Sequence, residues 1–163
     1  MIGLGTYKLS SESAYTITRE GLRMGYRIVD TAELYENEIA VNRAIVDSGI
    51  DRKEITLITK LRVVNSEQVE KRIKIFGQID ILLLHKPTTV NDWDWLCKNP
   101  RAEINHLGVS NFELVHLQKL AIKPFCNQIE ISPFWTRENL VKFHNQHNII
   151  TMAHSPLTKG RKF

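Results

Sequence analysis

Short apolar runs alternate with stretches of helical spacing along almost the whole chain. The apolar runs predict seven strands, at residues 2–7, 27–32, 55–60, 79–85, 104–110, 125–131 and 149–154. The stretches between them predict helices at residues 13–25, 38–47, 66–76, 113–120 and 137–148, and Ser66 is the expected N-cap of the third. A shorter segment with Trp93 and Trp95 is interrupted at Asn99-Pro100. We expect at least one of these tryptophans to anchor that segment to the rest of the fold.

A strand followed by a helix every 20 to 30 residues indicates parallel strands joined by crossover helices. The runs ITLIT and DILLL are almost continuously apolar, as expected when both faces of a sheet are covered. An open doubly wound α/β sheet and a closed (β/α)8 TIM-type barrel both fit this pattern. Polar residues follow successive apolar runs, and they favour the barrel because its strand ends converge on one mouth. These residues are Asp30, Lys60, His85, Ser110, Asn111, Gln128, Glu130, His154 and Ser155.

The composition is that of a folded chain with a sizeable core, since 42% of its 163 residues are hydrophobic and 25% are charged. We expect a single domain over residues 1–163. The net charge of +4 comes from 22 Lys and Arg interspersed with 18 Asp and Glu, which gives no support to a nucleic-acid partner. Cys97 and Cys126 are expected to be free thiols, buried or partly buried, in a cytoplasmic protein. Without a signal-like start or a long apolar run, no membrane partner is expected.

The stretch RIVDTAELYENE at residues 27–38 is the strongest candidate for a functional site. In it an apolar pair leads directly into Asp30, and Tyr35 follows in a polar loop that ends at Asn37 and Glu38. A hydrophobic core does not require this arrangement. An aspartate at the carboxyl end of a strand followed by a loop tyrosine is typical of a site on an α/β scaffold, because loops at that rim present side chains to a ligand.

Several segments carry a resemblance to a known family. They are GLGTY at 3–7, GYRIVDTAELYENE at 25–38, TK at 59–60, IDILLLHKP at 79–87, LGVSNF at 107–112, NQIEISP at 127–133 and AHSPLTKG at 153–160. In this order, and over almost the whole chain, they resemble the aldo-keto reductase family. The resemblance implies a (β/α)8 barrel and an oxidoreductase that reduces aldehydes or ketones to alcohols with hydride from a nicotinamide cofactor.

The resemblance also implies a catalytic set of four residues. Carbonyl reduction needs a proton on the developing alkoxide as well as a hydride on carbon. Tyr35 matches the family's proton donor, and Lys60 matches the lysine whose charge is expected to favour the ionised phenol and so lower its pKa. Asp30 would hold this lysine charged and oriented. His85 matches the histidine that orients the substrate carbonyl.

NADPH is the cofactor that the resemblance implies, with NADH as the alternative. Three matching residues would bond the nicotinamide carboxamide, one stands where the family usually stacks a tyrosine on the nicotinamide, and two match positions along the pyrophosphate. In that order they are Ser110, Asn111 and Gln128, then His154, then Ser155 and Leu157, with Asp30 as a further cofactor contact. An imidazole can still stack on the ring, with less area. Ser155-Pro156 can equally be an ordinary turn.

The expected substrate-binding residues are Tyr7, His85 and Lys86. Lys86 replaces the tryptophan that commonly follows the histidine in the family, which favours acidic or phosphorylated substrates over bulky aromatic ones. His144 and His147 are interpreted as surface histidines, because no third ligand accompanies them, and no metal site is expected.

A (β/α)8 barrel typically takes about 250 residues, whereas the predicted strands end with the seventh. We therefore expect the last β/α unit, and the family's basic segment for the adenosine 2′-phosphate, to be missing. Sheet edges at residues 2–7 and 149–153 would then be unpaired and favour self-association, and cofactor binding would be weak with little preference for NADPH over NADH. The alternative function is a catalytically weak or inactive relative that acts as a binding or interaction protein.

Overall fold

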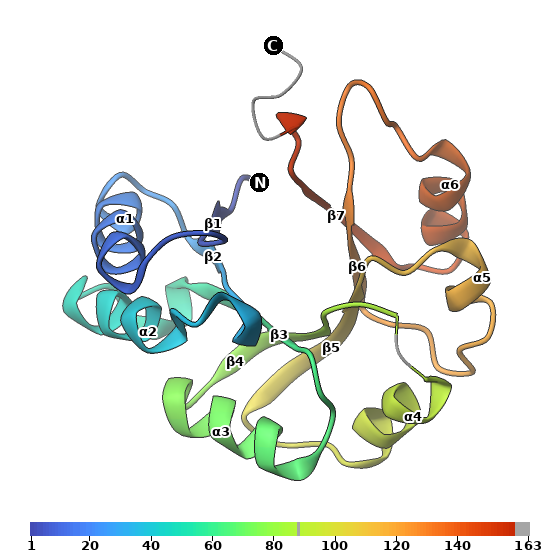
Figure 1. The fold of residues 1–163 in the computed structure, drawn as a ribbon, viewed down its shortest axis with the longest axis horizontal. Coiled ribbons are helices and arrows are strands. Elements are labelled where there is room, and N and C mark those ends of the chain that lie inside the picture. The colour runs from blue at the N-terminus through green and yellow to red at the C-terminus, as the bar shows by residue number, and fades with distance from the viewer. Residues whose placement is uncertain (88, 159–163) are drawn as a thin grey trace. The chain divides into compact units, whose positions relative to one another are not determined.

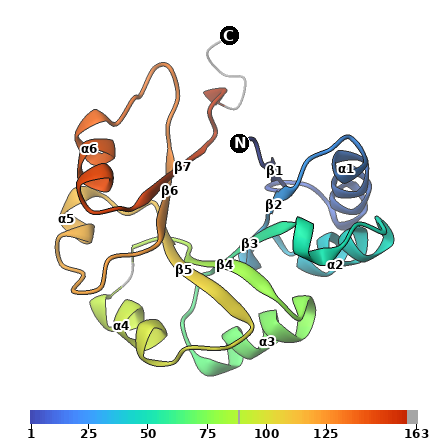
Figure 2. The ribbon, with the colours of Figure 1, turned by 180° about the vertical axis from the view of Figure 1, so that it is seen from behind.

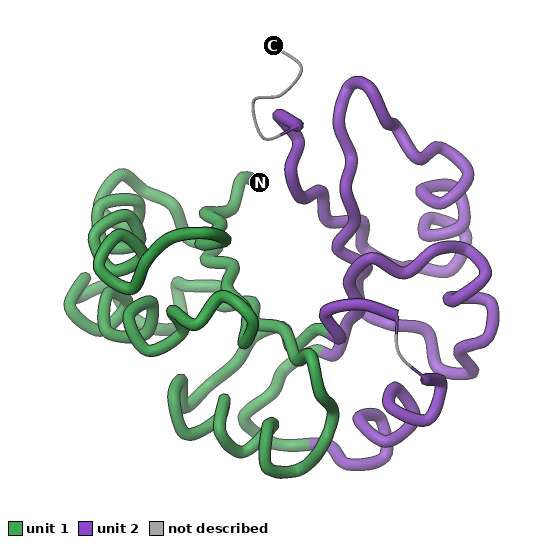
Figure 3. The backbone as a smooth tube through the Cα atoms, viewed as in Figure 1, with its two compact units in different colours: residues 1–83, 101–106 green, residues 84–100, 107–163 purple. Residues whose placement is uncertain are grey.

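The structure is a computed structural model that describes residues 1–87 and 89–158. The chain divides into two compact units, coloured separately in Figure 3. The first unit contains residues 1–83 and 101–106, and the second contains the described parts of residues 84–100 and 107–163. Each unit is described by itself below. The prediction of a single domain over residues 1–163 stays a prediction.

The first unit alternates strands with helices. Its elements are β1 (Leu4–Gly5), α1 (Ser11–Arg23), β2 (Ile28–Asp30), the 3-10 helix η1 (Glu33–Tyr35), α2 (Glu38–Asp47), the 3-10 helix η2 (Arg52–Glu54), β3 (Thr56–Leu61), α3 (Ser66–Phe76) and β4 (Ile79–Leu84). Strand β2 pairs in parallel with both β1 and β3, which places Asp30 opposite Ile58. Helix α1 packs beside α2 (Figure 1). Buried apolar residues of these elements form the core, among them Leu22, Val29, Val41, Leu57 and Leu83.

Two helices of this unit, α1 and α3, begin at side chains that cap them. The Ser10 hydroxyl accepts a hydrogen bond from the Ser13 amide at the start of α1. The predicted cap of α3 is wrong by one residue, because Asn65 rather than Ser66 is the N-cap. Asn65 has extended backbone, and its Oδ1 accepts from the Gln68 amide at 2.8 Å. Both side chains are good caps, so composition alone did not distinguish them.

Residues 101–106 join the first unit through polar contacts with β4. The Asp80 carboxylate accepts hydrogen bonds from the Leu57 amide and from Arg52, each at 2.8 Å, and from the Asn105 side chain at 3.2 Å. The Ile79 amide donates to the Glu103 carbonyl at 2.8 Å. The returning segment therefore completes hydrogen bonds that β4 would otherwise lack.

The second unit contains α4 (Val90–Lys98), the end of β5 (Ile104–Ser110), α5 (Leu114–Leu117), β6 (Cys126–Glu130), α6 (Glu138–Gln146) and β7 (Ile150–His154), shown from behind in Figure 2. Strand β6 pairs in parallel with β5 and β7, so that Ser110 lies opposite Gln128. Trp93 is buried and its indole N–H donates to the Ile122 carbonyl at 2.8 Å, which confirms the anchoring role predicted for one tryptophan. Helix α4 ends at Lys98 with Asn99 as its C-cap, directly before the proline that predicts the interruption.

Seven strands lie within the described residues, as predicted, and their hydrogen-bonded order is the sequence order β1 to β7. Cys97 and Cys126 are free thiols, partly buried and buried respectively, which also confirms their prediction. Nowhere in residues 1–87 and 89–158 is there a helix long and apolar enough to cross a membrane.

His144 corrects one prediction, because it is fully buried rather than on the surface. Its Nδ1 lies 2.8 Å from the Thr151 hydroxyl, and its Nε2 lies 3.1 Å from the Asn127 side-chain nitrogen. An amide nitrogen can only donate, so Nε2 accepts and Nδ1 carries the hydrogen of a neutral ring. His147 is exposed, as predicted, with its ring stacked on Phe143.

Stability is expected to fall in mild acid because of His144. Burial lowers the pKa of this imidazole below its usual value, and the positive charge of Arg137 adds to the effect. The unfolded chain therefore binds a proton at this histidine more readily than the folded chain does. The stability that neutral His144 contributes is fully present above the ordinary pKa of 6.5, and it is lost as the pH falls through the lowered pKa of the folded chain. Urea denaturation at about pH 7.5 and about pH 5.5 measures the loss. His144→Gln should reduce it and His147→Gln should not; equal pH dependence in all three proteins would contradict the assignment.

Candidate active site

Lys60 is the centre of a polar cluster at the carboxyl ends of β2 and β3. Its Nζ lies 2.6 and 2.8 Å from the two carboxylate oxygens of Asp30, 2.9 Å from the Thr31 carbonyl and 3.3 Å from the Tyr35 hydroxyl. The register explains the contact, because Asp30 lies opposite Ile58 and Lys60 follows two residues later on the same face of β3. The lysine side chain is only 1% exposed. The cluster therefore brings together Asp30, Tyr35 and Lys60.

The proton on Lys60 depends on its acidic neighbours. Burial lowers the pKa of the Lys60 ammonium from its usual value, while the charge and hydrogen bonds of Asp30, and the charge of Glu38, act in the opposite direction. A desolvated ammonium is costly unless it is paired and hydrogen-bonded. Asp30 supplies both, as two short contacts.

The expected lowering of the Tyr35 pKa is wrong in direction. Burial raises the pKa of the Tyr35 phenol, and the negative charge of Asp30 and the neighbouring Tyr7 raise it further. The phenol is therefore protonated at neutral pH. Since the Lys60 ammonium donates to the phenol oxygen, the proton of that hydroxyl points away from Lys60.

Asn37 fixes the loop that carries Tyr35, although no role was predicted for it from the sequence. Its side-chain nitrogen donates to the carbonyls of Thr6 and Leu9 at 3.0 and 3.1 Å, and its Oδ1 accepts from the Thr31 hydroxyl at 3.0 Å. The ring of Tyr7 lies 5.1 Å from that of Tyr35, centroid to centroid. The buried amide thus ties the predicted substrate residue Tyr7 to the tyrosine loop. Its place in the motif YENE was the signal that could have identified it.

A buried ion pair lies next to the same loop. Glu38 opens α2, and its carboxylate accepts from the Thr59 hydroxyl at 2.6 Å and from the Arg72 guanidinium at 3.0 and 3.1 Å. Both charged side chains are almost fully buried. Arg72 lies on α3 in a sequence of many charges, and nothing in the sequence distinguished it.

In the second unit, the predicted cofactor residues form one chain of hydrogen bonds. The Ser110 hydroxyl donates to the Gln128 backbone carbonyl at 3.0 Å, and the Asn111 side-chain nitrogen donates to the Ser110 hydroxyl at 3.0 Å. His154 contacts Asn111 at 3.0 Å and Ser155 at 3.2 Å. The structure therefore brings five of the predicted residues together at the ends of β5, β6 and β7.

The other predicted residues of this unit lie outside this chain of hydrogen bonds or contact it through the backbone. The His85 carbonyl accepts from the Asn111 side chain at 3.1 Å, and Lys86 and Leu157 are exposed. The motif AHSPLTKG includes Lys159 and Gly160, which are outside the described residues. Over the described parts of the chain, no group of three side chains could hold a metal ion.

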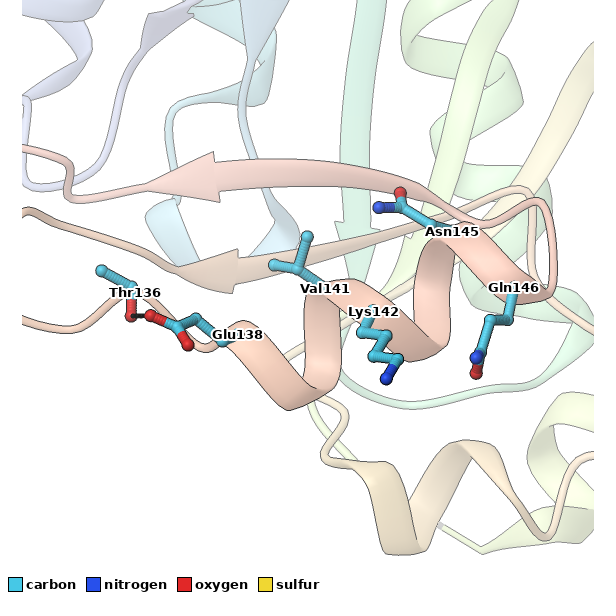
Figure 4. A pocket seen from close by; sticks show the side chains of 6 residues that line it. All are labelled: Thr136, Glu138, Val141, Lys142, Asn145 and Gln146. Atoms are coloured by element: carbon cyan, nitrogen blue, oxygen red, sulfur yellow. Dashed lines mark hydrogen bonds between the residues drawn. The ribbon is translucent and has the colours of Figure 1, made fainter.

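A hollow along α6 contains none of the candidate residues. It is lined by Thr136, Glu138, Val141, Lys142, Asn145 and Gln146, and Figure 4 shows these side chains along the helix. All of them except Val141 are polar and exposed, so they offer no buried acid, base or nucleophile. The candidate chemistry lies at the strand ends instead.

The chain is similar to known proteins over almost its whole length. A sequence profile described as the Aldo/keto reductase family matches residues 1–162. The chain is 36% identical to the 9,11-endoperoxide prostaglandin H2 reductase of Trypanosoma cruzi, over 99% of this chain and 63% of that protein. It is 31% identical to the methylglyoxal reductase DkgA of Escherichia coli, over 99% of this chain and 64% of that protein. The chain thus spans about 64% of the length of the curated relatives it matches.

The similarity extends to solved structures. A crystal structure of a Gox0644 variant in complex with NADPH has a TM-score of 0.87 and 32% identity, and the match covers 98% of this chain and 64% of that chain. The prediction of a (β/α)8-type fold that is incomplete, with seven strands present, is confirmed. On the strength of the family match over residues 1–162 and of these relatives, the chain belongs to the aldo/keto reductase family.

Proposed function

We propose that the chain reduces an aldehyde or ketone to an alcohol, with Tyr35 as the proton donor. The observation that carries the proposal is the buried contact of Lys60 with both Asp30 and the Tyr35 hydroxyl. An ammonium held between a carboxylate and a phenol is suited to stabilise negative charge on the phenol oxygen. The family membership supports the same reaction, whereas the alternative of a non-catalytic interaction protein is not favoured.

The raised pKa of Tyr35 is compatible with this role. A protonated phenol is the form that can donate, and it loses its proton only to a strongly basic oxygen such as a developing alkoxide. As the proton leaves, the phenolate forms beside the Lys60 ammonium, 3.3 Å away in the resting site. Asp30 balances the lysine charge before the transfer. The cluster then carries one net negative charge, spread over groups that are already in place.

The proposed cofactor is NADPH, with NADH as the alternative. When bound, it supplies the hydride that reduces the carbonyl carbon. The hydroxyl and amide groups of Ser110, Asn111 and Gln128 suit a carboxamide, which presents one acceptor and two donors. A relative, the Gox0644 variant, has been solved with NADPH. His154 is proposed as the stacking ring, Ser155 and Leu157 as pyrophosphate contacts, and Asp30 as a further contact.

The proposed substrate is a small carbonyl compound with negative charge or polar groups. Tyr7 is half exposed beside Tyr35 and offers an apolar surface. His85 is proposed to orient the carbonyl, and the exposed Lys86 to attract an acidic or phosphorylated group. The free thiols Cys97 and Cys126 support a reducing compartment such as the cytoplasm. Self-association, and the absence of nucleic-acid and membrane partners, stay predictions.

The reaction itself provides the test. We expect the purified chain to consume NADPH when a short aldehyde such as methylglyoxal is added, with one alcohol formed for each NADPH. The rate is followed by the loss of NADPH absorbance, and quenching of tryptophan fluorescence measures cofactor binding separately. His147→Gln, an exposed change outside the proposed site, serves as the matched control. A folded chain that binds NADPH but shows no aldehyde-dependent consumption would refute the proposed activity.

A further inference from the structure

Arg72 is a buried cation of the first unit that the proposed reaction does not use. Its side chain is 3% exposed on α3. The guanidinium reaches one Glu38 oxygen at 3.0 and 3.1 Å and comes within 3.9 Å of Glu33. It also donates to the Gln68 carbonyl at 3.2 Å. A cation in such a place needs a reason, because taking it out of water costs free energy that a well-packed apolar side chain would not.

The two carboxylates that Arg72 contacts stand at the two ends of the segment that carries Tyr35. Glu33 opens the 3-10 helix that ends at Tyr35, and Glu38 opens α2. Each carboxylate also accepts a hydrogen bond from β3 or from the residue after it. Glu33 accepts from the Arg62 backbone amide at 2.9 Å, and Glu38 accepts from the Thr59 hydroxyl at 2.6 Å. Arg72 therefore holds both ends of a six-residue loop against the strand that carries Lys60.

Charge as well as geometry connects Arg72 to the lysine. Thr59, which bonds to Glu38, directly precedes Lys60, and the Glu38 charge raises the pKa of Lys60. Because Arg72 pairs with Glu38, its positive charge balances the carboxylate whose negative charge acts on the Lys60 ammonium. The guanidinium is rigid and planar, so it can bridge two carboxylates in a fixed geometry that a lysine ammonium cannot reproduce.

We propose that Arg72 is a positioning residue for Tyr35. By holding Glu33 and Glu38 together, it fixes the place of the phenol oxygen relative to the Lys60 ammonium. The effect on reaction rate rests on the proposed carbonyl reduction, whereas the effect on the position of Tyr35 does not. Arg72 touches neither substrate nor cofactor in this scheme.

Arg72→Lys is the informative substitution. It keeps a positive charge beside Glu38 but removes the planar guanidinium, whose several nitrogens reach both Glu38 and Glu33. We expect kcat to fall roughly 10- to 100-fold, the loss typical of a reacting group displaced by about 1 Å. The dissociation constant for NADPH should stay within about twofold, and the urea midpoint close to that of the wild type, since Glu38 keeps a cationic partner. A general structural defect would instead lower the urea midpoint and weaken cofactor binding as well.

Arg101→Lys is the matched control. Arg101 pairs with Glu70 of helix α3 at 3.0 Å, and that pair is partly exposed. We expect wild-type kcat in this variant. A loss equal to that of Arg72→Lys would overturn the proposal, since an arginine-to-lysine change that only disturbs an ion pair with α3 would then have the same effect.

A second readout does not depend on activity. The chain has four tyrosines, so 3-fluorotyrosine labelling gives few 19F signals, and that of Tyr35 is the one missing from Tyr35→Phe. We expect Arg72→Lys to shift or broaden this signal, and that of the neighbouring Tyr7 with it, and to leave the signals of Tyr15 and Tyr26 unchanged. An unchanged Tyr35 signal overturns the proposal, whatever the rate. A shifted signal in a chain that reduces no aldehyde supports the positioning role and refutes the proposed reaction alone.

Discussion

Tyr35→Phe is expected to lower kcat for carbonyl reduction by about 10²- to 10⁴-fold, the usual cost of losing a general acid. The ring still packs against Tyr7, and only the hydroxyl that contacts Lys60 is removed. The dissociation constant for NADPH should therefore change little. Steady-state kinetics with a short aldehyde, together with fluorescence titration of NADPH, measure the two effects independently.

Tyr15→Phe gives a matched control for this prediction. This substitution also removes a hydroxyl that donates to a charged group, because the Tyr15 hydroxyl donates to Asp47 at 2.8 Å. That hydrogen bond, however, lies at the surface between α1 and α2. The Tyr15→Phe variant should reduce the aldehyde at the wild-type rate. If Tyr35→Phe reduced the aldehyde as fast as Tyr15→Phe, another residue would have to be the proton donor.

Lys60→Met is expected to damage both the reaction and the fold. The rate should fall because no cation remains to stabilise the developing phenolate. Stability should fall by about 3–5 kcal/mol, as measured elsewhere when one partner of a buried ion pair is removed, because the Asp30 carboxylate is left without its cation. The Asp30 side chain is 19% exposed, so water compensates part of this cost and the lower end of the range is expected. Urea denaturation measures the change in free energy of unfolding.

The double variant Asp30→Asn with Lys60→Met separates the charge from the packing. Removing the carboxylate as well should recover much of the stability that Lys60→Met loses, while the rate stays low. If Lys60→Met were as stable as the wild type, the pair would not be desolvated as described. If the double variant were no more stable than Lys60→Met, the loss would come from packing of the lysine stem.

Element positions could be predicted where apolar spacing was strong, as in α2 and α3, whose bounds agree with the sequence analysis. Helix α5 is much shorter than the predicted 113–120, because only Leu114–Leu117 keep helical bonds. His144 shows how a single residue misleads. It lies four residues after the buried Leu140, so the two share one face of α6, and this spacing was the overlooked signal.

The contact between Asp30, Tyr35 and Lys60 could be predicted from the sequence, but its electrostatics could not. Motif order identified Asp30, Tyr35 and Lys60, and the structure brings them into contact. The direction of the Tyr35 pKa depends on how deeply the ring is buried and on its distance from Asp30, and neither is written in the sequence. Arg72 was missed for the same reason, since a charged residue on an amphipathic helix is usually solvated.

The contacts of Asp80 and Ile79 with residues 103–105 determine when the first unit can finish folding during synthesis. A ribosome that has completed β4 has not yet made the segment 101–106 on which those contacts depend. At translation rates of about 5–20 residues per second, the ribosome makes α4 first, and one second or more passes between the end of β4 and the addition of Asn105. The amino-terminal unit is therefore not finished before its successor has begun. A released fragment that ends near residue 100 should be far more sensitive to protease than one that ends just after β5.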